Sequence, residues 1–186
     1  MSTQPPIFPM IETERLILRE IVHADAAALF KVHGDFESMK WFGSDPLPDE
    51  AAAVKLVELF ASWRALNNPG TRWGLQIKGE KELVGTCGLF GWQRNWRRCT
   101  LGYELHPCAR GEGYMREALS AVLPWGWEHM ALNRVEAQIH PDNADSLRSV
   151  EAIGFKREGL LRQAGFWAGQ YHDLYQYSLL REDWLS

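Results

Sequence analysis

A short glycine-containing segment, Arg110-Gly111-Glu112-Gly113-Tyr114-Met115, carries the clearest chemical signal in the sequence. Two glycines one residue apart let the backbone turn sharply and approach a ligand without Cβ atoms in the way. A helix beginning just after them would add unpaired N–H groups and the positive end of its dipole. Such a loop suits an anion, most naturally a phosphate or pyrophosphate.

The elements on either side of this loop have the order that such a site requires. Residues Arg98 to Leu105 are typical of a strand, and a helix is predicted from Glu112 to about Met130. We expect this helix to kink near residues 120–124, because Pro124 lacks an N–H and its ring crowds the preceding turn. A β-rich run, Arg134 to His140, follows the helix, so the two strands are predicted to be parallel in a right-handed βαβ unit.

The remaining segments predict a mixed α/β fold. Further strands are expected at Arg15 to Ile21, Thr71 to Ile77, Glu82 to Leu89, Phe155 to Gln163 and Tyr171 to Leu180. Further helices are expected from Asp25 to His33, after Asp49-Glu50, and from Asn143 to Ile153 with Gly154 just past its end. The three strands before the glycine loop are most simply an antiparallel meander. All 186 residues are expected to form one domain, with residues 1–12 as an extended N-terminal arm.

Composition argues against several classes of function. The net charge of −4 disfavours a nucleic-acid partner, which normally requires a basic surface. The chain has no apolar run of the ~20 residues that span a bilayer and no N-terminal signal sequence, which indicates a cytoplasmic protein without a membrane partner. Cys87, Cys99 and Cys108 lack C-x-x-C spacing and are expected to be free thiols. No His/Cys cluster has the spacing of a metal site, so no metal is expected.

The glycine loop differs from the two commonest nucleotide-binding motifs. It lacks the Gly-Lys-Ser/Thr ending of a P-loop, and Arg116 stands where a dinucleotide fingerprint has its third Gly. A nucleotide-dependent enzyme is therefore disfavoured.

In its wider context, the loop resembles that of the GNAT superfamily of N-acetyltransferases, and in particular the ribosomal-protein N-terminal acetyltransferase (RimJ/RimL-like) branch. Gly111 and Gly113 fall on the two small positions of the family's Gln/Arg-x-x-Gly-x-Gly/Ala loop. Other matching segments follow in the family's order: Thr13 to Arg19, Leu101 to Pro107, Asn133-Arg134-Val135, His140 to Ser146, Ile153-Gly154-Phe155, Glu158-Gly159, Tyr171 to Leu174 and Asp183-Trp184. The resemblance spans nearly the whole chain.

This resemblance implies a fold and a cosubstrate. The fold would be a GNAT-like three-layer α/β structure, in which a twisted mixed sheet contains an antiparallel meander and two splayed parallel strands, with helices on both faces. The cosubstrate would be acetyl-CoA, with its phosphates on the loop's N–H groups and its pantetheine arm between the splayed strands. A backbone N–H at Leu105 or His106 would bind the thioester oxygen, where negative charge develops. The expected binding residues are Leu105, His106, Arg110, Gly111, Glu112, Gly113, Tyr114, Met115 and Asn143.

The resemblance also implies candidates for the catalytic groups. Ser146 would be the acid that protonates the leaving thiolate, while Asn143 would bind pantetheine or cap the helix. Helix capping also accounts for both residue types, and the two roles are compatible. Cys108, at the first loop position where the family usually has Gln or Arg, is not expected to carry the acyl group, and Arg110 or Arg116 would replace its phosphate contact.

The general base is less well defined by the sequence. Thr100 and Gly165 occupy the two positions where relatives carry a Glu. Glu104 lies four residues beyond Thr100 and therefore on the same face of the strand, which makes it our candidate base, with a solvated strand residue as the alternative. Three histidines, His106, His140 and His172, are further candidates by pKa alone.

The predicted activity is acetyl transfer from acetyl-CoA to a primary amine, by direct attack in a ternary complex. The acceptor would be a protein N-terminus, such as that of a ribosomal protein, or a small-molecule amine. The alternative is a catalytically inactive CoA-binding sensor or scaffold, because both familiar base positions lack Glu. Six aromatic residues could hold the acceptor or could be core or dimer contacts, which leaves a homodimer open: Phe36, Trp41, Phe42, Phe166, Trp167 and Tyr171.

Overall fold

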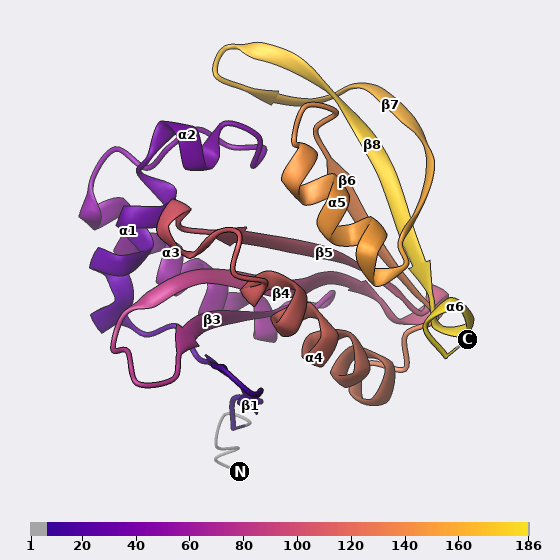
Figure 1. Cartoon of the computed structure of the whole chain (residues 1–186), viewed down its shortest axis with the longest axis horizontal. Helices are drawn as coiled ribbons and strands as arrows, with labels where there is room; N and C mark the ends of the chain where they lie inside the picture. The colour runs from indigo at the N-terminus through magenta and orange to yellow at the C-terminus, as the bar shows by residue number, and fades with distance from the viewer. Residues whose placement is uncertain (1–6, 186) are drawn as a thin grey trace.

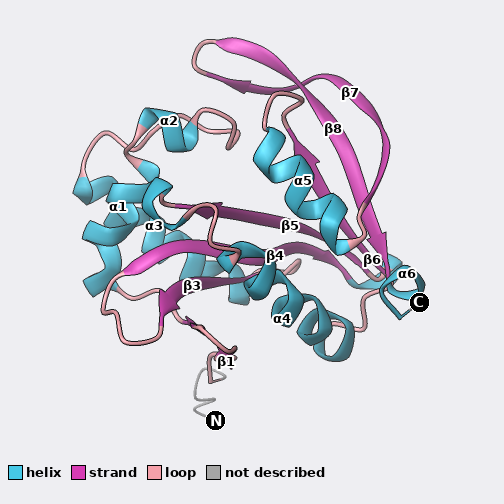
Figure 2. Ribbon diagram, viewed as in Figure 1, coloured by secondary structure: helices cyan, strands magenta, loops and turns pink. Residues whose placement is uncertain are grey.

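The computed structural model describes residues 7–185 and contains a mixed sheet of eight strands in the order β1-β2-β3-β4-β5-β6-β8-β7 (Figure 2). The strands are β1 (Ile11–Glu12), β2 (Leu16–Arg19), β3 (Thr71–Ile77), β4 (Leu83–Gln93), β5 (Arg98–Leu105), β6 (Arg134–Ile139), β7 (Lys156–Trp167) and β8 (Gln170–Leu180). The helices are α1 (Ala26–His33), α2 (Phe36–Met39), α3 (Glu50–Ser62), α4 (Tyr114–His129), α5 (Ala144–Ile153) and α6 (Arg181–Leu185). The β5–β6 pair is parallel and the other neighbouring pairs are antiparallel, as the meander and the βαβ unit predicted.

Helices cover both faces of the sheet (Figure 1). Along β3, Trp73 and Leu75 belong to the core cluster that α4 completes. The intervening Gly74 lies against Leu83, which belongs to the second cluster with α1 and α3. Because successive strand residues point to opposite faces, α4 lies on one face and the α1–α3 pair on the other. Val150 of α5 joins the same cluster as α4.

Most predicted elements are present with shifted ends. β5 has the predicted limits, whereas α4 begins at Tyr114 rather than Glu112, because Gly113 is its N-cap with φ of +79°. The four-residue helix α2 was not predicted, since so short a segment shows no periodicity. The proposed N-terminal arm is partly paired: β1 joins the sheet beside β2, while residues 1–6 lie outside the described part of the chain.

Pro124 does not end α4, which continues as a helix through it to His129. The bend expected at residues 120–124 stays a prediction. Two residues further on, Gly126 permits close packing on the sheet, since a Cβ there would lie 2.7 Å from Leu89 Cδ1. Within residues 7–185, no helix is both long enough and apolar enough to cross a membrane.

The sheet is open between β5 and β6, as predicted. Their parallel pairing comprises three residue pairs and ends at Thr100 and Glu136. Beyond this point β5 continues to Leu105 beside β4, and β6 continues to Ile139 beside β8. The two strands therefore leave a gap in the sheet that starts one residue after their last pair.

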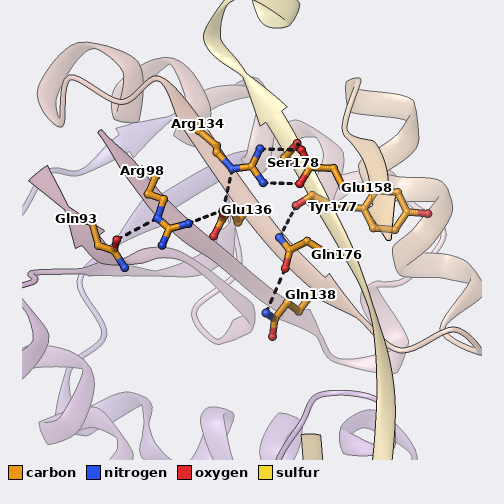
Figure 3. Close-up of polar contacts among 9 residues, drawn as sticks. All are labelled: Gln93, Arg98, Arg134, Glu136, Gln138, Glu158, Gln176, Tyr177 and Ser178. Carbon is orange, nitrogen blue, oxygen red and sulfur yellow. Dashed lines mark hydrogen bonds and ion pairs between the residues drawn. The ribbon is translucent and has the colours of Figure 1, made fainter. Parts of the chain in front are cut away.

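A polar network joins the strands at the closed end of this gap (Figure 3). Arg134 donates to Glu136 of its own strand over 2.7 Å and to Glu158 of β7 over 2.8 Å. Arg98 of β5 donates to the same Glu136 carboxylate, and Ser178 of β8 donates to Glu158. The network thus links β5, β6, β8 and β7 where the splay begins.

Candidate functional site

A cavity of about 520 Å³ occupies the gap in the sheet. It runs from the glycine loop and the start of α4, past β5, β6 and α5, to α2 and the loop after it. The predicted site residues that line it are Glu104, Leu105, Arg110, Gly111, Gly113, Tyr114, Met115, Asn143 and Ser146. Of the remaining predicted residues, His106 and Glu112 are outside this lining. Tertiary structure therefore brings three separate segments of the sequence to one cleft.

The glycine loop has the geometry of an anion site. Gly111 and Gly113 adopt φ of +83° and +79°, which residues with a Cβ rarely adopt. A Cβ built on Gly111 would meet nothing within 4 Å, so space for a ligand lies beside the backbone. Within residues 7–185, no N–H of residues 111–113 donates to a backbone carbonyl, and the first turn of α4 supplies further free N–H groups. The residues present thus fit a phosphate.

Hydrogen bonds from the N-terminal segment hold this loop in place, and sequence reasoning did not predict them. The Glu117 carboxylate of α4 accepts hydrogen bonds from Thr13 Oγ1 over 2.6 Å and from Arg15 N and Nε over 2.7 Å. Arg15 Nη1 donates to the carbonyl of Glu112, and its guanidinium lies 4.6 Å from the Tyr114 ring centroid. Burial alone would raise the pKa of Glu117, but these donors outweigh it and lower the pKa.

The two candidate backbone donors at the end of β5 differ in orientation. The N–H of His106 donates to the carbonyl of Val84 over 2.8 Å and is therefore engaged with β4. In an antiparallel pair, alternate residues point their N–H groups to opposite edges. The N–H of Leu105 consequently faces the gap beside β6. Of the two, Leu105 is the residue positioned to contact a ligand in the cleft.

Ser146 and Asn143 lie at the start of α5 in the predicted capping arrangement. Asn143 is the N-cap, and its Oδ1 accepts a hydrogen bond from Ser146 N over 3.2 Å. The Ser146 hydroxyl lies 2.7 Å from the hydroxyl of Tyr103, a residue of β5 that sequence reasoning missed. Burial raises the pKa of Tyr103 to about 12. The alternation Leu101–Tyr103–Leu105 could have indicated that Tyr103 points into the gap.

Glu104, the candidate base, is a buried carboxylate with a full set of partners. Arg72 Nη2 forms an ion pair with its Oε2, and Thr86 Oγ1 donates to its Oε1. His33 Nε2 lies 3.0 Å from the same Oε1, although its N–H is not aimed along that line. Burial would raise the pKa of Glu104, but Arg72, His33 and Thr86 outweigh it and lower the pKa. Glu104 is therefore ionised at neutral pH.

Of the two family base positions, Gly165 has no room for a longer side chain unless Trp167 moves. A Cβ on Gly165 would lie 2.3 Å from the Trp167 ring, so Trp167 occupies the space that a longer side chain needs. Trp167 in turn stacks on His172, with ring centroids 3.7 Å apart. Thr100 ends the parallel pairing, at the closed end of the gap.

The histidine candidates lie beside the cleft and do not appear in its lining. His172 Nδ1 is 3.3 Å from His140 Nε2, and the His140 ring stacks on Trp41 with centroids 4.1 Å apart. Burial lowers the pKa of His140. His106 Nδ1 lies 2.8 Å from Cys108 Sγ, outside the cleft. These contacts favour a packing role for His140 and His172.

Five of the six predicted aromatic residues divide into three groups, and the sixth, Phe36 of α2, is 56% exposed and outside the cleft lining. Trp41 and Phe42 line the cleft. Trp167 is buried and its Nε1 donates to the carbonyl of Lys40 over 3.1 Å, which fastens the β7–β8 hairpin to the segment after α2. Phe166 and Tyr171 contact each other and are 61% and 66% exposed. Only the first group is placed to contact an acceptor inside the cleft.

Comparisons of the sequence and of the fold with known proteins all match acetyltransferases. A family profile described as the acetyltransferase (GNAT) domain matches residues 15–156. The uncharacterized N-acetyltransferase YoaA of Bacillus subtilis is 33% identical over 175 residues, covering 94% of this chain and 98% of the relative. The [ribosomal protein uS5]-alanine N-acetyltransferase of Escherichia coli is 25% identical over 94% of this chain and 92% of its own length. The crystal structure of a GNAT-family acetyltransferase from Bacillus anthracis matches with a TM-score of 0.82 and 26% identity, over 94% of this chain and 99% of that one.

Proposed function

The chain belongs to the GNAT acetyltransferase family, and from that membership we propose that it moves an acetyl group from acetyl-CoA to a primary amine in a ternary complex. The observation that carries the proposal is the single cleft that contains the glycine loop, the splayed end of β5 and Ser146. One end of this cleft has an anion site for the donor, and the other end has polar side chains. An acceptor can approach this second end from the face of the sheet opposite to the donor.

The donor would be held by the chain at three points. The N–H groups of the loop and of the first turn of α4 would bind its phosphates, with Arg110 and Arg116 as neighbouring cations. Asn143 would contact the pantetheine arm, and the N–H of Leu105 would bind the thioester oxygen. Acetyl-CoA supplies an activated acyl group whose carbonyl oxygen gains negative charge on attack, so a fixed N–H donor there lowers the barrier.

Ser146 would act as the general acid and Glu104 as the general base. Ser146 would donate to the departing sulfur, since its hydroxyl lines the cleft beside α5. Glu104 would attract the acceptor amine and accept the proton that its nitrogen loses, directly or through water. Because Glu104 is ionised, it can accept a proton without first losing one. Its lowered pKa makes it a weak base.

We propose the N-terminal amine of a protein as acceptor, because the E. coli relative is named as an alanine N-acetyltransferase of ribosomal protein uS5. Trp41 and Phe42 would contact its first side chains at the acceptor end of the cleft. A small amine is the second candidate. A single domain, a cytoplasmic location and a homodimer stay predictions.

Calorimetric titration with acetyl-CoA tests the donor site. Wild-type protein should bind, and Gly111→Asp should not, because its side chain and charge would occupy the phosphate position. The matched control is Gly79→Asp, which places the same residue at a positive φ of +89° in the β3–β4 turn, with open space around its Cβ. Equal binding by Gly111→Asp and wild type would refute the phosphate site.

Free-thiol release across a panel of N-terminal peptides and small amines then tests transfer. Release with peptides and not with polyamines would support the proposed acceptor. Binding of acetyl-CoA without release for any acceptor would instead indicate the inactive CoA sensor.

A further inference from the structure

Tyr103 has no part in the transfer described above, yet its hydroxyl contacts the candidate acid. The hydroxyl oxygen lies 2.7 Å from Ser146 Oγ and 3.3 Å from the Ser146 carbonyl oxygen. The side chain thereby joins β5 to α5 across the gap in the sheet. Both residues line the cleft.

These contacts restrict where the Ser146 hydrogen can point. Among residues 7–185, the Tyr103 hydroxyl is the hydrogen-bond partner recorded for Ser146 Oγ. Tyr103 can donate either to the Ser146 carbonyl over 3.3 Å or to Oγ over 2.7 Å, and either hydroxyl can be the donor in the second bond. We assign the Tyr103 hydrogen to Oγ because the shorter bond is the stronger one. A serine oxygen that accepts this bond keeps its own hydrogen free for a group in the cleft.

The ionisation of Tyr103 is consistent with a permanent donor. Burial raises its pKa to about 12, and the hydrogen bond with Ser146 opposes that shift to a smaller extent. At neutral pH the phenol keeps its proton. Tyr103 can therefore stabilise negative charge that develops on Ser146 Oγ.

We propose that Tyr103 is a positioning residue, whose hydroxyl donates to Ser146 Oγ and directs the Ser146 hydrogen toward the leaving sulfur. This inference rests on the proposed function. As the acceptor nitrogen bonds to the acetyl carbon, Glu104 takes the proton that the nitrogen loses. As the carbon–sulfur bond breaks, the sulfur keeps the electron pair and takes the Ser146 proton. Tyr103 stabilises the serine oxygen until solvent returns a proton to it, and Glu104 releases its proton to solvent.

The test is a double-mutant cycle of Tyr103→Phe and Ser146→Ala, read as kcat for thiol release at saturating acetyl-CoA. Tyr103→Phe should lower kcat roughly 10- to 100-fold, the effect of one hydrogen bond to a developing charge. Its Kd for acetyl-CoA should stay close to the wild-type value. In the Ser146→Ala background the same change should have no further effect, because Tyr103 acts through Ser146.

Tyr177→Phe is the matched control. It also removes a hydroxyl that hydrogen-bonds α5, since Tyr177 donates to Glu151 over 2.6 Å, but Tyr177 is not part of the cleft lining. Its kcat should stay near wild type. If the effects of the two changes multiply, or if Tyr103→Phe no longer binds acetyl-CoA, Tyr103 is a packing residue and the inference is wrong. A different result would be that the wild type releases no thiol. That result would refute the proposed function, and the role of Tyr103 would fall with it.

Discussion

Tyr103 and Glu104 are neighbours in β5 that point to opposite faces of the sheet, yet both line the same cleft. Tyr103 contacts Ser146 of α5, whereas Glu104 contacts Arg72 and lies near His33 of α1. Both can reach one space because the sheet is open beside them, after the last β5–β6 pair. The gap thus connects the face of the sheet that α4 and α5 cover, the proposed donor side, with the face that α1 covers, the proposed acceptor side.

Replacing Ser146 with Ala should lower kcat at saturating acetyl-CoA by about 100-fold or more, because a proton donor to the sulfur is lost. Acetyl-CoA binding should change little, since Asn143 still caps α5. Thiol release and calorimetry measure the two effects. Ser120→Ala, at an exposed position on α4, serves as the control. The reverse pattern, lost binding with normal turnover, would make Ser146 structural.

The pH profile of kcat/KM should show no step near neutral pH from the ionisation of Glu104. Its pKa lies below the ordinary carboxyl value, so the group is charged from mildly acidic pH upward. The rise in rate toward alkaline pH should instead follow the pKa of the acceptor amine. Rate profiles with two acceptors of different amine pKa measure this. If Glu104→Gln removed a limb between pH 6 and 8, roughly the range in which an unperturbed His titrates, the ionised assignment would be wrong.

Arg72→Met should lower the free energy of unfolding by about 3–5 kcal/mol, because it leaves a buried carboxylate without its cation. Chemical denaturation measures the loss. Adding Glu104→Gln should recover part of it, since the uncompensated charge is then gone. Arg148→Met is the control: Arg148 pairs with Asp145 at the surface, where ion pairs contribute about 0–1 kcal/mol. A loss no larger than that of the control would contradict the buried ion pair.

Gly165→Ala should destabilise the protein by about 1–3 kcal/mol through overpacking against the Trp167 ring. Gly159→Ala lies in the same strand with no atom within 4 Å of its Cβ, so it provides a matched comparison. Urea denaturation of both variants gives the difference. Equal stabilities would show that Trp167 moves aside without cost.

Glu158→Gln should flatten the acid dependence of stability. The hydrogen bonds from Arg134 lower the pKa of Glu158 to about 2, against an opposing effect of burial. Its contribution is therefore complete above the unfolded-state pKa of about 4.3 and is lost as the pH falls toward about 2. Because the side chain is 42% exposed, solvent limits the contribution to about 1 kcal/mol. Unfolding measured from pH 5 to pH 2, with Glu128→Gln on the surface of α4 as control, tests this. Parallel curves for wild type and Glu158→Gln would rule it out.

The features predictable from the sequence were those that depend on neighbouring residues. Glycines at positions 111 and 113 select a positive φ locally, Asn143 caps the helix that follows it, and alternation in Arg98 to Leu105 defines a strand without reference to the rest of the chain. The meander, the parallel β5–β6 pair and the splay followed from the order of these elements and from the family resemblance, whereas the position of β8 between β6 and β7 was not predicted. The helix α2 was not predicted because its four residues are too few to show a helical periodicity.

The environment of each functional group depended on contacts between distant segments. Tyr103 meets Ser146 across 43 residues of sequence, and Arg15 meets Glu117 across 102. The choice between the N–H groups of Leu105 and His106 follows from the register with β4, which local sequence does not specify. The ionisation of Glu104 likewise reflects burial and charges from two other elements. Backbone preference is a short-range property, whereas burial, register and pKa are set by packing, so they become defined only when the chain is folded.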